Sequence, residues 1–352
     1  MRILVLGDSY CPASVLRAAF GQLAVDHTID FADVVDEPSW QPRTDSDRGL
    51  REYLGSPDQV IARLDGHEVL VVQGAPISAA VLDAAPLRLI GVARGGPVNV
   101  DVAAATVRGI PVITTPGKNA DAVAELTIAL VVILARRLAD AFRHIDRGGE
   151  FGHDNYEGSA WFGHNLAGRT LGLLGFGQIG RRVARRARAF EMEVVAHDPF
   201  VAARELEEHG VRPVTLDELL ATADHVSLHA RLNDDNRGLF DQRRFAAMRP
   251  GATFINTARA ELVDESALVA ALQSGHLGGA ALDIATPSPA TGLHPLLSCP
   301  NVVVLPHIGG ATVETLIRGG EMAAAEVGRL AAGLPLLNVV NPAALEARIQ
   351  PR

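Results

Sequence analysis

Three glycines in the middle of the chain have the spacing of a phosphate-binding loop. Gly175, Gly177 and Gly180 form a G-x-G-x-x-G pattern directly after the apolar run Leu171–Leu174, and Asp198 stands 18 positions after Gly180. In such a loop the first glycine permits a tight turn, the second lets the backbone approach a pyrophosphate, and the third lets a helix pack closely on the strand. An acid at this distance accepts hydrogen bonds from the ribose hydroxyls of NAD. A glycine-rich turn without a ligand would explain the glycines but not the acid, so the pattern predicts dinucleotide binding.

A cation and an imidazole follow two later strand-like segments. Arg259 comes after the apolar run at 253–256, and His307 comes after the run at 302–305. Ligands of open α/β sheets lie at the carboxyl ends of the strands. An arginine there can hold a carboxylate and polarise a carbonyl group, and a histidine can deliver a proton. The pair therefore suits hydride transfer to a 2-oxo acid; the alternatives are a surface arginine and a core histidine.

Two further segments at predicted strand ends carry groups that suit a binding site. Asp283 ends the run at 279–283, and Arg94, Gly95 and Gly96 follow the run at 89–93. We interpret the Arg94–Gly96 loop as part of the substrate site, because its glycines leave backbone N–H groups open to a ligand; the alternative is a plain turn. Asp283 stands where a ligand of such a sheet would lie, and the alternative is a simple cap of the turn that follows.

The order of the predicted elements indicates an α/β protein with two parallel sheets. The first 115 residues alternate strand and helix but lack the glycine triplet, so this part is not the expected dinucleotide binder. A long helix is expected over about 120–145. Six strands follow, near 171–174, 193–196, 226–229, 253–256, 279–283 and 302–305, which is the number of strands in a complete doubly wound dinucleotide fold. The helix expected over 312–332 is assigned back to the first domain.

Composition excludes several classes of protein. The 352 residues carry a formal net charge of −9, which argues against a nucleic-acid groove or an anionic membrane surface. The longest apolar run, Leu126–Ala135, is too short to cross a bilayer. Two cysteines without metal-ligand spacing favour a reducing compartment, which we take as cytoplasmic. His225 and His229 lie four residues apart on a predicted strand without a carboxylate partner, so no metal site is expected.

Taken together, these segments resemble the D-isomer-specific 2-hydroxy-acid dehydrogenases. The resemblance spans about residues 68–330 and includes RGIPV, NADAVAELTIALVV, LAGRTLGLLGFGQIGRRVA, HDPF, MRPGATFINTARAELVDESALVAAL, GGAALD and NVVVLPHIGGAT. It implies two Rossmann-like doubly wound domains with a cleft between them. The substrate domain would comprise 1–118 and 308–352, and the NAD-binding domain 119–307. It also implies NAD(H), a small 2-hydroxy or 2-oxo acid, and a homodimer formed through the helix at 120–145.

The resemblance also assigns roles to individual residues. It makes Arg259 the carboxylate anchor and His307 the acid and base, and it places Asp283 near the nicotinamide. The candidate cofactor-binding residues are Gly175, Gly177, Gln178, Ile179, Gly180, Asp198, Thr257, Ala258 and Asp283.

One departure from the family pattern concerns the partner of the histidine. The family places a glutamate five residues after the position of Asp283, where it orients the histidine and favours its protonated form. This chain has Ser288 there. Two hypotheses follow. The chain is an NAD-dependent 2-hydroxy-acid dehydrogenase, or it is an NAD(H)-binding sensor or corepressor-like protein with weak or no catalysis. The intact Arg259 and His307 favour the enzyme.

Overall fold

The protein folds into two compact α/β units. The computed structural model describes residues 1–21, 23, 26–149, 162–286 and 294–346. Unit 1 comprises Met1–Lys118 and Thr312–Arg352, and unit 2 comprises Asn119–Ala311. The chain therefore passes between the units at 118/119 and 311/312, whereas the sequence placed the second boundary four residues earlier, at 307/308. Ser288 lies outside the described residues.

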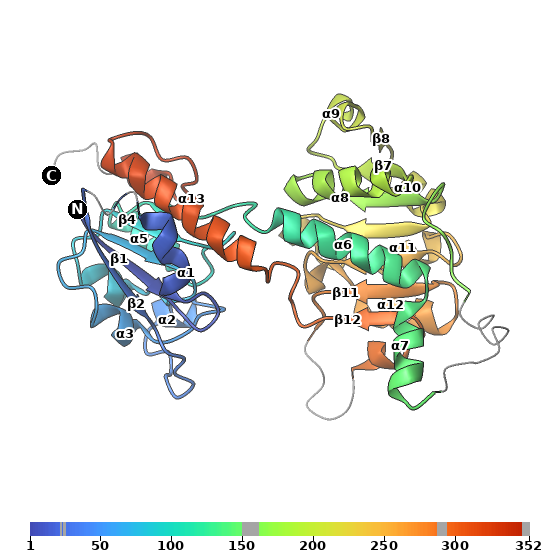
Figure 1. The fold of residues 1–352 in the computed structure, drawn as a ribbon, viewed down its shortest axis with the longest axis horizontal. Coiled ribbons are helices and arrows are strands. Elements are labelled where there is room, and N and C mark those ends of the chain that lie inside the picture. The colour runs from blue at the N-terminus through green and yellow to red at the C-terminus, as the bar shows by residue number, and fades with distance from the viewer. Residues whose placement is uncertain (22, 24–25, 150–161, 287–293, 347–352) are drawn as a thin grey trace. The chain divides into compact units, whose positions relative to one another are not determined.

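Unit 1 is built on a five-stranded parallel sheet with the order β2-β1-β3-β4-β5 (Figure 1). Its strands are β1 (Arg2–Gly7), β2 (Thr28–Asp33), β3 (Val69–Val72), β4 (Leu89–Val92) and β5 (Val112–Ile113). Its helices are α1 (Ala13–Arg17), η1 (Ala18–Phe20), α2 (Asp45–Arg48), α3 (Pro57–Ile61), α4 (Ala79–Asp83), α5 (Val102–Val107), α13 (Val313–Ala331) and α14 (Ala343–Glu346).

Apolar residues on both faces of β1 explain why this sheet is covered on both sides. Ile3 and Val5 pack into a core shared with α1, η1 and α13, while Leu4 and Leu6 pack into a second core with α3, α4 and α5. Strands that are apolar throughout are typical of parallel sheets between two helix layers. The helix α13 thus returns the end of the chain to the sheet at which it began, as the sequence indicated.

Unit 2 is built on a seven-stranded parallel sheet with the order β12-β11-β10-β9-β6-β7-β8. Its strands are β6 (Thr170–Leu174), β7 (Glu193–His197), β8 (Arg212–Pro213), β9 (His225–Leu228), β10 (Thr253–Asn256), β11 (Gly279–Leu282) and β12 (Val302–Val304). Its helices are α6 (Ala120–Ala135), α7 (Leu138–Asp146), α8 (Gln178–Ala189), α9 (Ala203–Glu208), α10 (Leu216–Thr222), η4 (Asp234–Asn236), α11 (Gln242–Ala247), η5 (Ala260–Leu262), α12 (Glu265–Gln273) and η6 (Pro295–Ser298).

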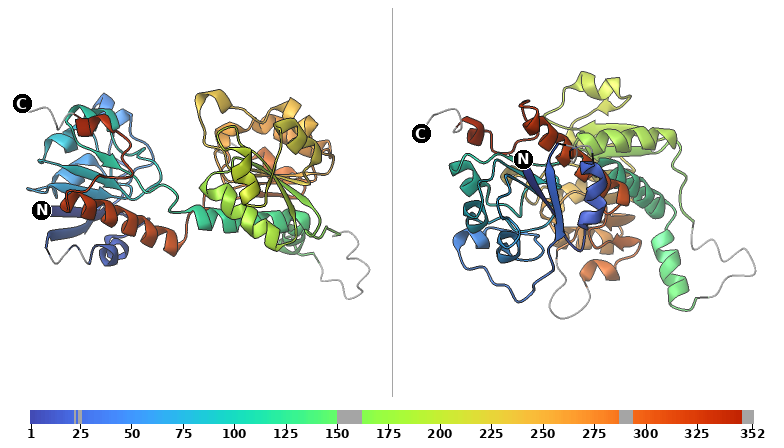
Figure 2. Two further views of the ribbon diagram at one scale, coloured as in Figure 1. Left: turned by 90° about the horizontal axis from the view of Figure 1, so that it is seen from above. Right: turned by 60° about the vertical axis from the view of Figure 1, so that its left-hand side comes forward.

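The strand order of unit 2 reverses direction between β6 and β9. The chain runs outward from β6 to β8 and then returns to the other side of β6 to continue with β9. Such a reversal is the topological switch point at which open α/β sheets bind their ligands. The helices α6 and α8 lie side by side on one face of this sheet (Figures 1 and 2).

Two sequence expectations about unit 2 were wrong. The sheet has seven strands and not six, because the short strand β8 pairs with β7 through Val195 and Ala196. The helix expected over 120–145 is two helices, α6 and α7, separated by Arg136 and Arg137. Arg137 has a left-handed backbone with φ 54°, which ends the helical hydrogen bonding and redirects the chain.

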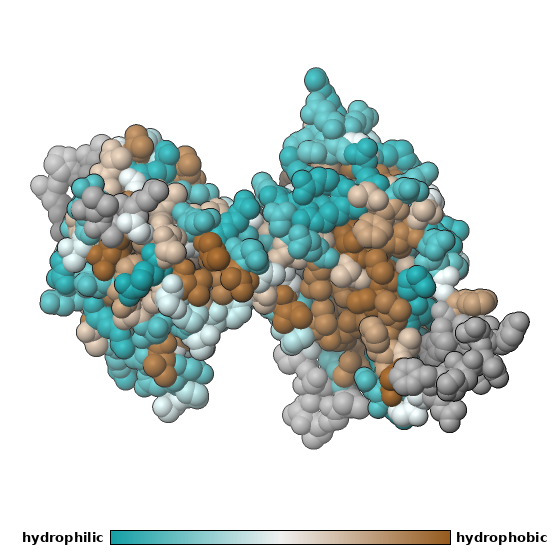
Figure 3. Space-filling view, viewed as in Figure 1, coloured by the Kyte–Doolittle hydropathy of each residue, from teal (hydrophilic) through white to brown (hydrophobic). Residues whose placement is uncertain are grey.

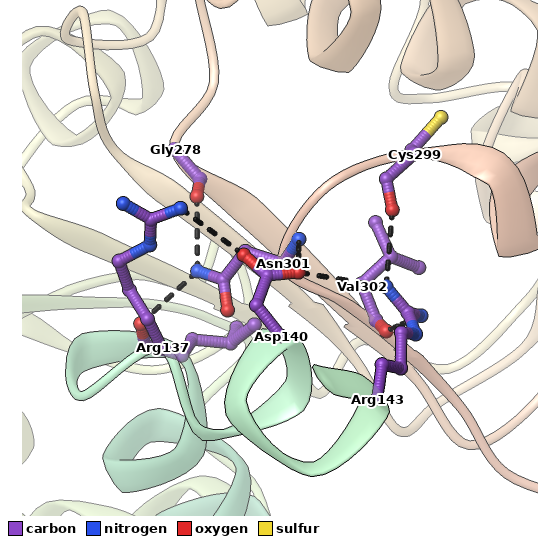
Figure 4. Close-up of polar contacts among 8 residues, drawn as sticks. Arg137, Asp140, Arg143, Gly278, Cys299, Asn301 and Val302 are labelled. Atoms are coloured by element: carbon purple, nitrogen blue, oxygen red, sulfur yellow. Dashed lines mark hydrogen bonds and ion pairs between the residues drawn. The ribbon is translucent and has the colours of Figure 1, made fainter. Parts of the chain in front are cut away.

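The second of these helices is tied to the beginning of β12 by buried polar contacts (Figure 4). Asp140 accepts a hydrogen bond from the backbone N–H of Asn301 at 2.7 Å, and the Asn301 amide donates to the carbonyl oxygens of Leu134 and Gly278 at 3.1 and 3.0 Å. Arg143 donates to the carbonyl oxygens of Cys299 and Val302. These contacts fix the strand that leads to His307.

Candidate functional site

The glycine loop after β6 has the geometry that its spacing predicts. Gly175 has φ 98°, and a Cβ atom there would lie 2.7 Å from the backbone of His229, so only glycine fits. A Cβ atom at Gly180 would lie 2.4 Å from the carbonyl oxygen of Gly175, which explains the close packing of α8. A Cβ atom at Gly177 would meet nothing within 4 Å. The backbone at Gly177 is therefore open to a ligand at the beginning of α8, where Gln178 and Ile179 form the first turn.

Asp198 follows β7 and contacts this same loop. Its Oδ2 atom accepts the backbone N–H of Phe176 at 2.7 Å, and its Oδ1 atom accepts that of Phe200 at 2.9 Å. Each carboxylate oxygen keeps a second lone pair for a ligand hydroxyl. Asp198 thus holds the glycine loop, a role that the sequence did not indicate.

The segment after β10 presents Arg259 to solvent. Asn256 braces this segment, because its amide donates to the carbonyl oxygen of Arg259 at 2.8 Å and accepts the N–H of Ala258 at 3.0 Å. Arg259 is exposed, and its guanidinium donates to the carbonyl oxygen of Ala258. Within the described residues no carboxylate pairs with it, so its charge is available to an anion. Thr257 is buried, with its hydroxyl 3.3 Å from that of Thr127 on α6.

The segment after β12 presents His307 in an unusual backbone conformation. His307 is exposed and has φ 58°, in the left-handed region that residues other than glycine seldom occupy. Its N–H donates to the carbonyl oxygen of Asp283 at 2.8 Å. In the part of the chain that the structure describes, no side chain hydrogen bonds to the imidazole. The expected neighbour Ser288 is outside that part, so its relation to His307 stays a prediction.

Asp283, which follows the preceding strand β11, holds the turn that carries His307. It is 2% exposed, and its Oδ1 and Oδ2 atoms accept the backbone N–H groups of Ile308 and Gly309, each at 2.8 Å. A Cβ atom at Gly309 would lie 2.6 Å from Oδ2, so the turn fits around the carboxylate. Sequence reasoning considered a nicotinamide contact or a cap for this residue and missed its bond to the histidine turn.

His225 on β9 and His229, directly after this strand, each contact a hydroxyl group. His225 Nδ1 lies 2.7 Å from the hydroxyl of Thr253, and burial lowers the pKa of His225 to about 4. His229 Nε2 lies 2.9 Å from the hydroxyl of Ser227, and burial likewise lowers the pKa of His229 to about 4. Both rings are therefore neutral at pH 7. Among the described residues, no group of three His, Cys, Asp or Glu side chains is arranged to hold a metal ion.

In unit 1, the loop of Arg94, Gly95 and Gly96 follows β4. Cβ atoms at Gly95 and Gly96 would meet nothing within 4 Å, so the backbone there is open. Arg94 is not free, however. It donates to the carbonyl oxygen of Glu52 at 2.7 Å and forms an ion pair with the Glu52 carboxylate. Nothing in the sequence indicated this partner, which is 42 residues away in the chain.

Known proteins match this chain in sequence. Residues 128–309 match the model of the D-isomer specific 2-hydroxyacid dehydrogenase NAD-binding domain. A D-3-phosphoglycerate dehydrogenase of Archaeoglobus fulgidus is 37% identical over 293 residues, which are 83% of this chain and 54% of that protein. The chain thus spans about half the length of the curated relatives it matches.

Solved structures of similar length also match. The TT0316 protein of Thermus thermophilus has a TM-score of 0.75 at 34% identity, covering 97% of this chain and 100% of that one. A protein of Polaromonas sp. JS6 66, described as a putative D-isomer specific 2-hydroxyacid dehydrogenase, has a TM-score of 0.76 at 30% identity, covering 97% and 99%.

Proposed function

The chain belongs to the D-isomer specific 2-hydroxyacid dehydrogenase family, and we propose that it transfers a hydride between NAD(H) and C2 of a small 2-hydroxy or 2-oxo acid. The observation that carries this proposal is the arrangement at one edge of the unit 2 sheet. The glycine loop, Arg259, Asp283 and His307 follow β6, β10, β11 and β12, and all of these strands are parallel. Their carboxyl ends therefore meet at one edge.

The residues of unit 2 offer the groups that NAD binding requires. The open backbone at Gly177 and the first turn of α8, Gln178 and Ile179, suit the pyrophosphate, and the Asp198 carboxylate suits the ribose hydroxyls. Thr257, Ala258 and Asp283 are the proposed neighbours of the nicotinamide end. When bound, the dinucleotide supplies or accepts the hydride.

The side chains of the protein bind and orient the substrate, and one of them transfers a proton. Arg259 is proposed to hold the substrate carboxylate and to polarise the C2 carbonyl, because its guanidinium is exposed and has no carboxylate partner among the described residues. His307 is proposed to donate a proton to the carbonyl oxygen during reduction and to accept it during oxidation. Asp283 keeps the His307 turn in place.

Oxidation of NADH, followed by its absorbance with a panel of 2-oxo acids, tests the proposal directly. We expect turnover with at least one acid, and its loss in both Arg259→Ala and His307→Gln. The second candidate is an NAD(H)-binding sensor or corepressor-like protein, which Ser288 favours because it replaces the glutamate of the family pattern. Tight NADH binding without turnover on any acid of the panel would support that candidate instead.

We further propose a homodimer in which a second copy covers α6 and α7. Apolar side chains gather over these helices on the face of unit 2 shown in Figure 3, and Phe142 and Ile145 of α7 are exposed. Exposed apolar surface of this kind marks association sites. Light scattering should give the mass of a dimer, and Phe142→Asp should shift it toward that of a monomer.

We propose that the protein is located in the cytoplasm. Cys11 and Cys299 are both buried and free, which suits a reducing compartment. Among the described helices, none combines the length and the apolar character that a membrane span requires.

A further inference from the structure

The strand that leads to His307 has few ladder contacts of its own. β12 comprises only the three residues Val302–Val304 and stands at the edge of the unit 2 sheet, next to β11. Three residues are at the short end of the usual range for strands. A shift of the pairing by one residue would move β12 by about 3.3 Å along its neighbour. The place of His307 therefore depends on contacts at the two ends of this strand.

The beginning of β12 is held by the side chain of Asn301. Its amide nitrogen donates to the carbonyl oxygen of Leu134, in the last turn of α6, and to that of Gly278, directly before β11, at 3.1 and 3.0 Å. A Cβ atom at Gly279 would lie 2.5 Å from this nitrogen, so the first residue of β11 must be a glycine. The amide thus joins three segments and fixes how β12 is aligned with β11.

The helix α7 also contacts this end of β12 (Figure 4). Asp140 accepts the backbone N–H of Asn301 at 2.7 Å, and Arg143 donates to the carbonyl oxygens of Cys299 and Val302. Asp140 and Arg143 also form an ion pair at 3.7 Å. The two residues are three positions apart in a helix and share one face. This face of α7 is therefore committed to the residues around Asn301.

Asn301 occupies its place at a conformational cost. It has a left-handed backbone with φ 48° and is 3% exposed, and its Oδ1 atom has no hydrogen-bond partner among the described residues. Five non-glycine residues of the described chain have a positive φ, and three of them belong to this arrangement: Arg137 before α7, Asn301 before β12 and His307 after it. Such costs persist only where the surroundings impose them, and they gather at functional sites. The strain at both ends of β12 thus points to a function that depends on where this strand lies.

We infer that Asn301, held by Asp140 and Arg143 of α7, is a positioning residue for proton transfer by His307. Its amide sets the alignment of β12 with β11, and this alignment brings the His307 N–H to the carbonyl oxygen of Asp283 at 2.8 Å. The inference rests on the proposed function, in which His307 exchanges a proton with the substrate. Asn301 acts through the strand and is not itself a catalytic residue.

Three variants test this role. Asn301→Gly removes the amide but suits the left-handed backbone, Asn301→Ala suits neither, and Arg143→Met leaves Asn301 intact and removes the contacts from α7. We expect kcat for reduction of a 2-oxo acid to fall about tenfold to a hundredfold in Asn301→Ala, because a displacement of about 1 Å from a remote substitution can cost that much. The losses in Asn301→Gly and Arg143→Met should be smaller. These two variants carry the test should Asn301→Ala fail to fold.

The matched control is Asn341→Ala in unit 1. Asn341 is also buried, and its amide likewise donates to a backbone carbonyl oxygen, that of Ile110. Its loss should lower the melting temperature without changing kcat. To separate positioning from loss of folded protein, kcat is expressed per NADH-binding site, titrated by fluorescence.

A second kinetic signature concerns the proton itself. The solvent deuterium isotope effect on kcat should be larger in Asn301→Ala than in the wild type, because proton transfer from a displaced His307 becomes slow relative to the other steps. The KM for NADH should change little. An unchanged kcat per site together with an unchanged isotope effect in the Asn301 variants would overturn the inference, and would leave Asn301 with the structural role expected of Asn341.

Hydrogen exchange provides a readout that does not require turnover. The N–H groups of His307, Ile308 and Gly309 all donate to Asp283, and mass spectrometry of the peptide that contains them gives their exchange rates. We expect severalfold faster exchange in the Asn301 variants and in Arg143→Met, and wild-type exchange in Asn341→Ala. Wild-type exchange in all of these variants would show that Asn301 does not hold the His307 turn.

The two kinds of measurement separate this inference from the proposed function. If the protein reduces 2-oxo acids while the variants at Asn301 and Arg143 keep wild-type kcat and exchange, the positioning role is rejected and the dehydrogenase stands. If the protein reduces no 2-oxo acid, the dehydrogenase is rejected. Faster exchange in the variants would then still support Asn301 as the residue that places His307, and unchanged exchange would reject that as well.

Discussion

The backbone carbonyl of Asp283 accepts the N–H of His307, and the Asp283 carboxylate accepts the N–H groups of Ile308 and Gly309, the two residues after the histidine. His307 needs such support, because its left-handed backbone is unfavourable for a residue with a side chain. Asp283 is therefore a positioning residue for the proposed acid and base.

Replacement of Asp283 by Asn should lower kcat/KM about tenfold to a hundredfold, which corresponds to roughly 1.4–2.7 kcal/mol. An amide has one acceptor oxygen, so one of the N–H groups of Ile308 and Gly309 would face an NH₂ group. Steady-state kinetics should show the loss in kcat with little change in the KM for NADH. A loss confined to the KM for NADH would instead indicate that the main role of Asp283 is cofactor contact. Asp241→Asn, which changes another carboxylate that accepts a backbone N–H in unit 2, is the matched control.

Arg259→Ala should lower kcat/KM by about 10²–10³, because both the substrate carboxylate and the developing oxyanion lose a charged donor. NADH affinity, measured by fluorescence titration, should change little. Arg237→Ala removes an exposed arginine of the same unit and should have no comparable effect. Near-normal efficiency of Arg259→Ala on the best substrate would show that another group anchors the carboxylate.

The protein should prefer NAD to NADP by tenfold or more, since about 1.4 kcal/mol suffices for that ratio. The carboxylate of Asp198 is fixed by Phe176 and Phe200 and would repel a 2′-phosphate. The following residues, Pro199 and Phe200, provide no cation to bind one. Comparison of kcat/KM for the two cofactors checks this preference. Equal values would show that Asp198 does not bind the ribose.

Ser288→Glu should move the falling limb of the reductive pH–rate profile to higher pH. Reduction requires a protonated His307, and a carboxylate beside an imidazole stabilises the charged ring whereas a serine supplies no charge. The measurement is a pair of profiles with saturating NADH, for the wild type and for Ser288→Glu. If the two coincide while His307→Gln abolishes activity, Ser288 is not the neighbour of the imidazole.

Acidification from pH 6.5 to 4 should lower the unfolding free energy of unit 2. Burial lowers the pKa of His225 from 6.5 to about 4, so in this window the unfolded chain binds a proton that the folded protein does not. The unfolded state is therefore favoured as the pH falls, before most carboxylates titrate. Denaturant unfolding at several pH values should show a weaker dependence in His225→Gln, while His209→Gln, at an exposed histidine, should follow the wild type. Equal dependence in all three would remove His225 as a cause.

The local pattern of the sequence predicted most of the fold. Glycine spacing, apolar runs of strand length and the helical segments between them are set by neighbouring residues, so two parallel α/β sheets and the loop at Gly175–Gly180 were predictable. The strand β8 was missed because two residues carry too little pattern, and the break at Arg137 was missed because nothing in an arginine's type indicates a left-handed backbone.

The partners of the candidate site residues were decided by tertiary structure alone. Strand order brings Asp283 next to the His307 turn, and a distant loop brings Glu52 to Arg94. The sequence alone does not indicate where the Lys118 side chain lies. In the structure its ammonium donates to the carbonyl oxygen of Ala93, 25 residues away, and its side chain lies beside Gly319, 201 residues away. The physical reason is that residue type determines what a group can do, whereas its charge balance and its available donors depend on which distant groups the fold places beside it.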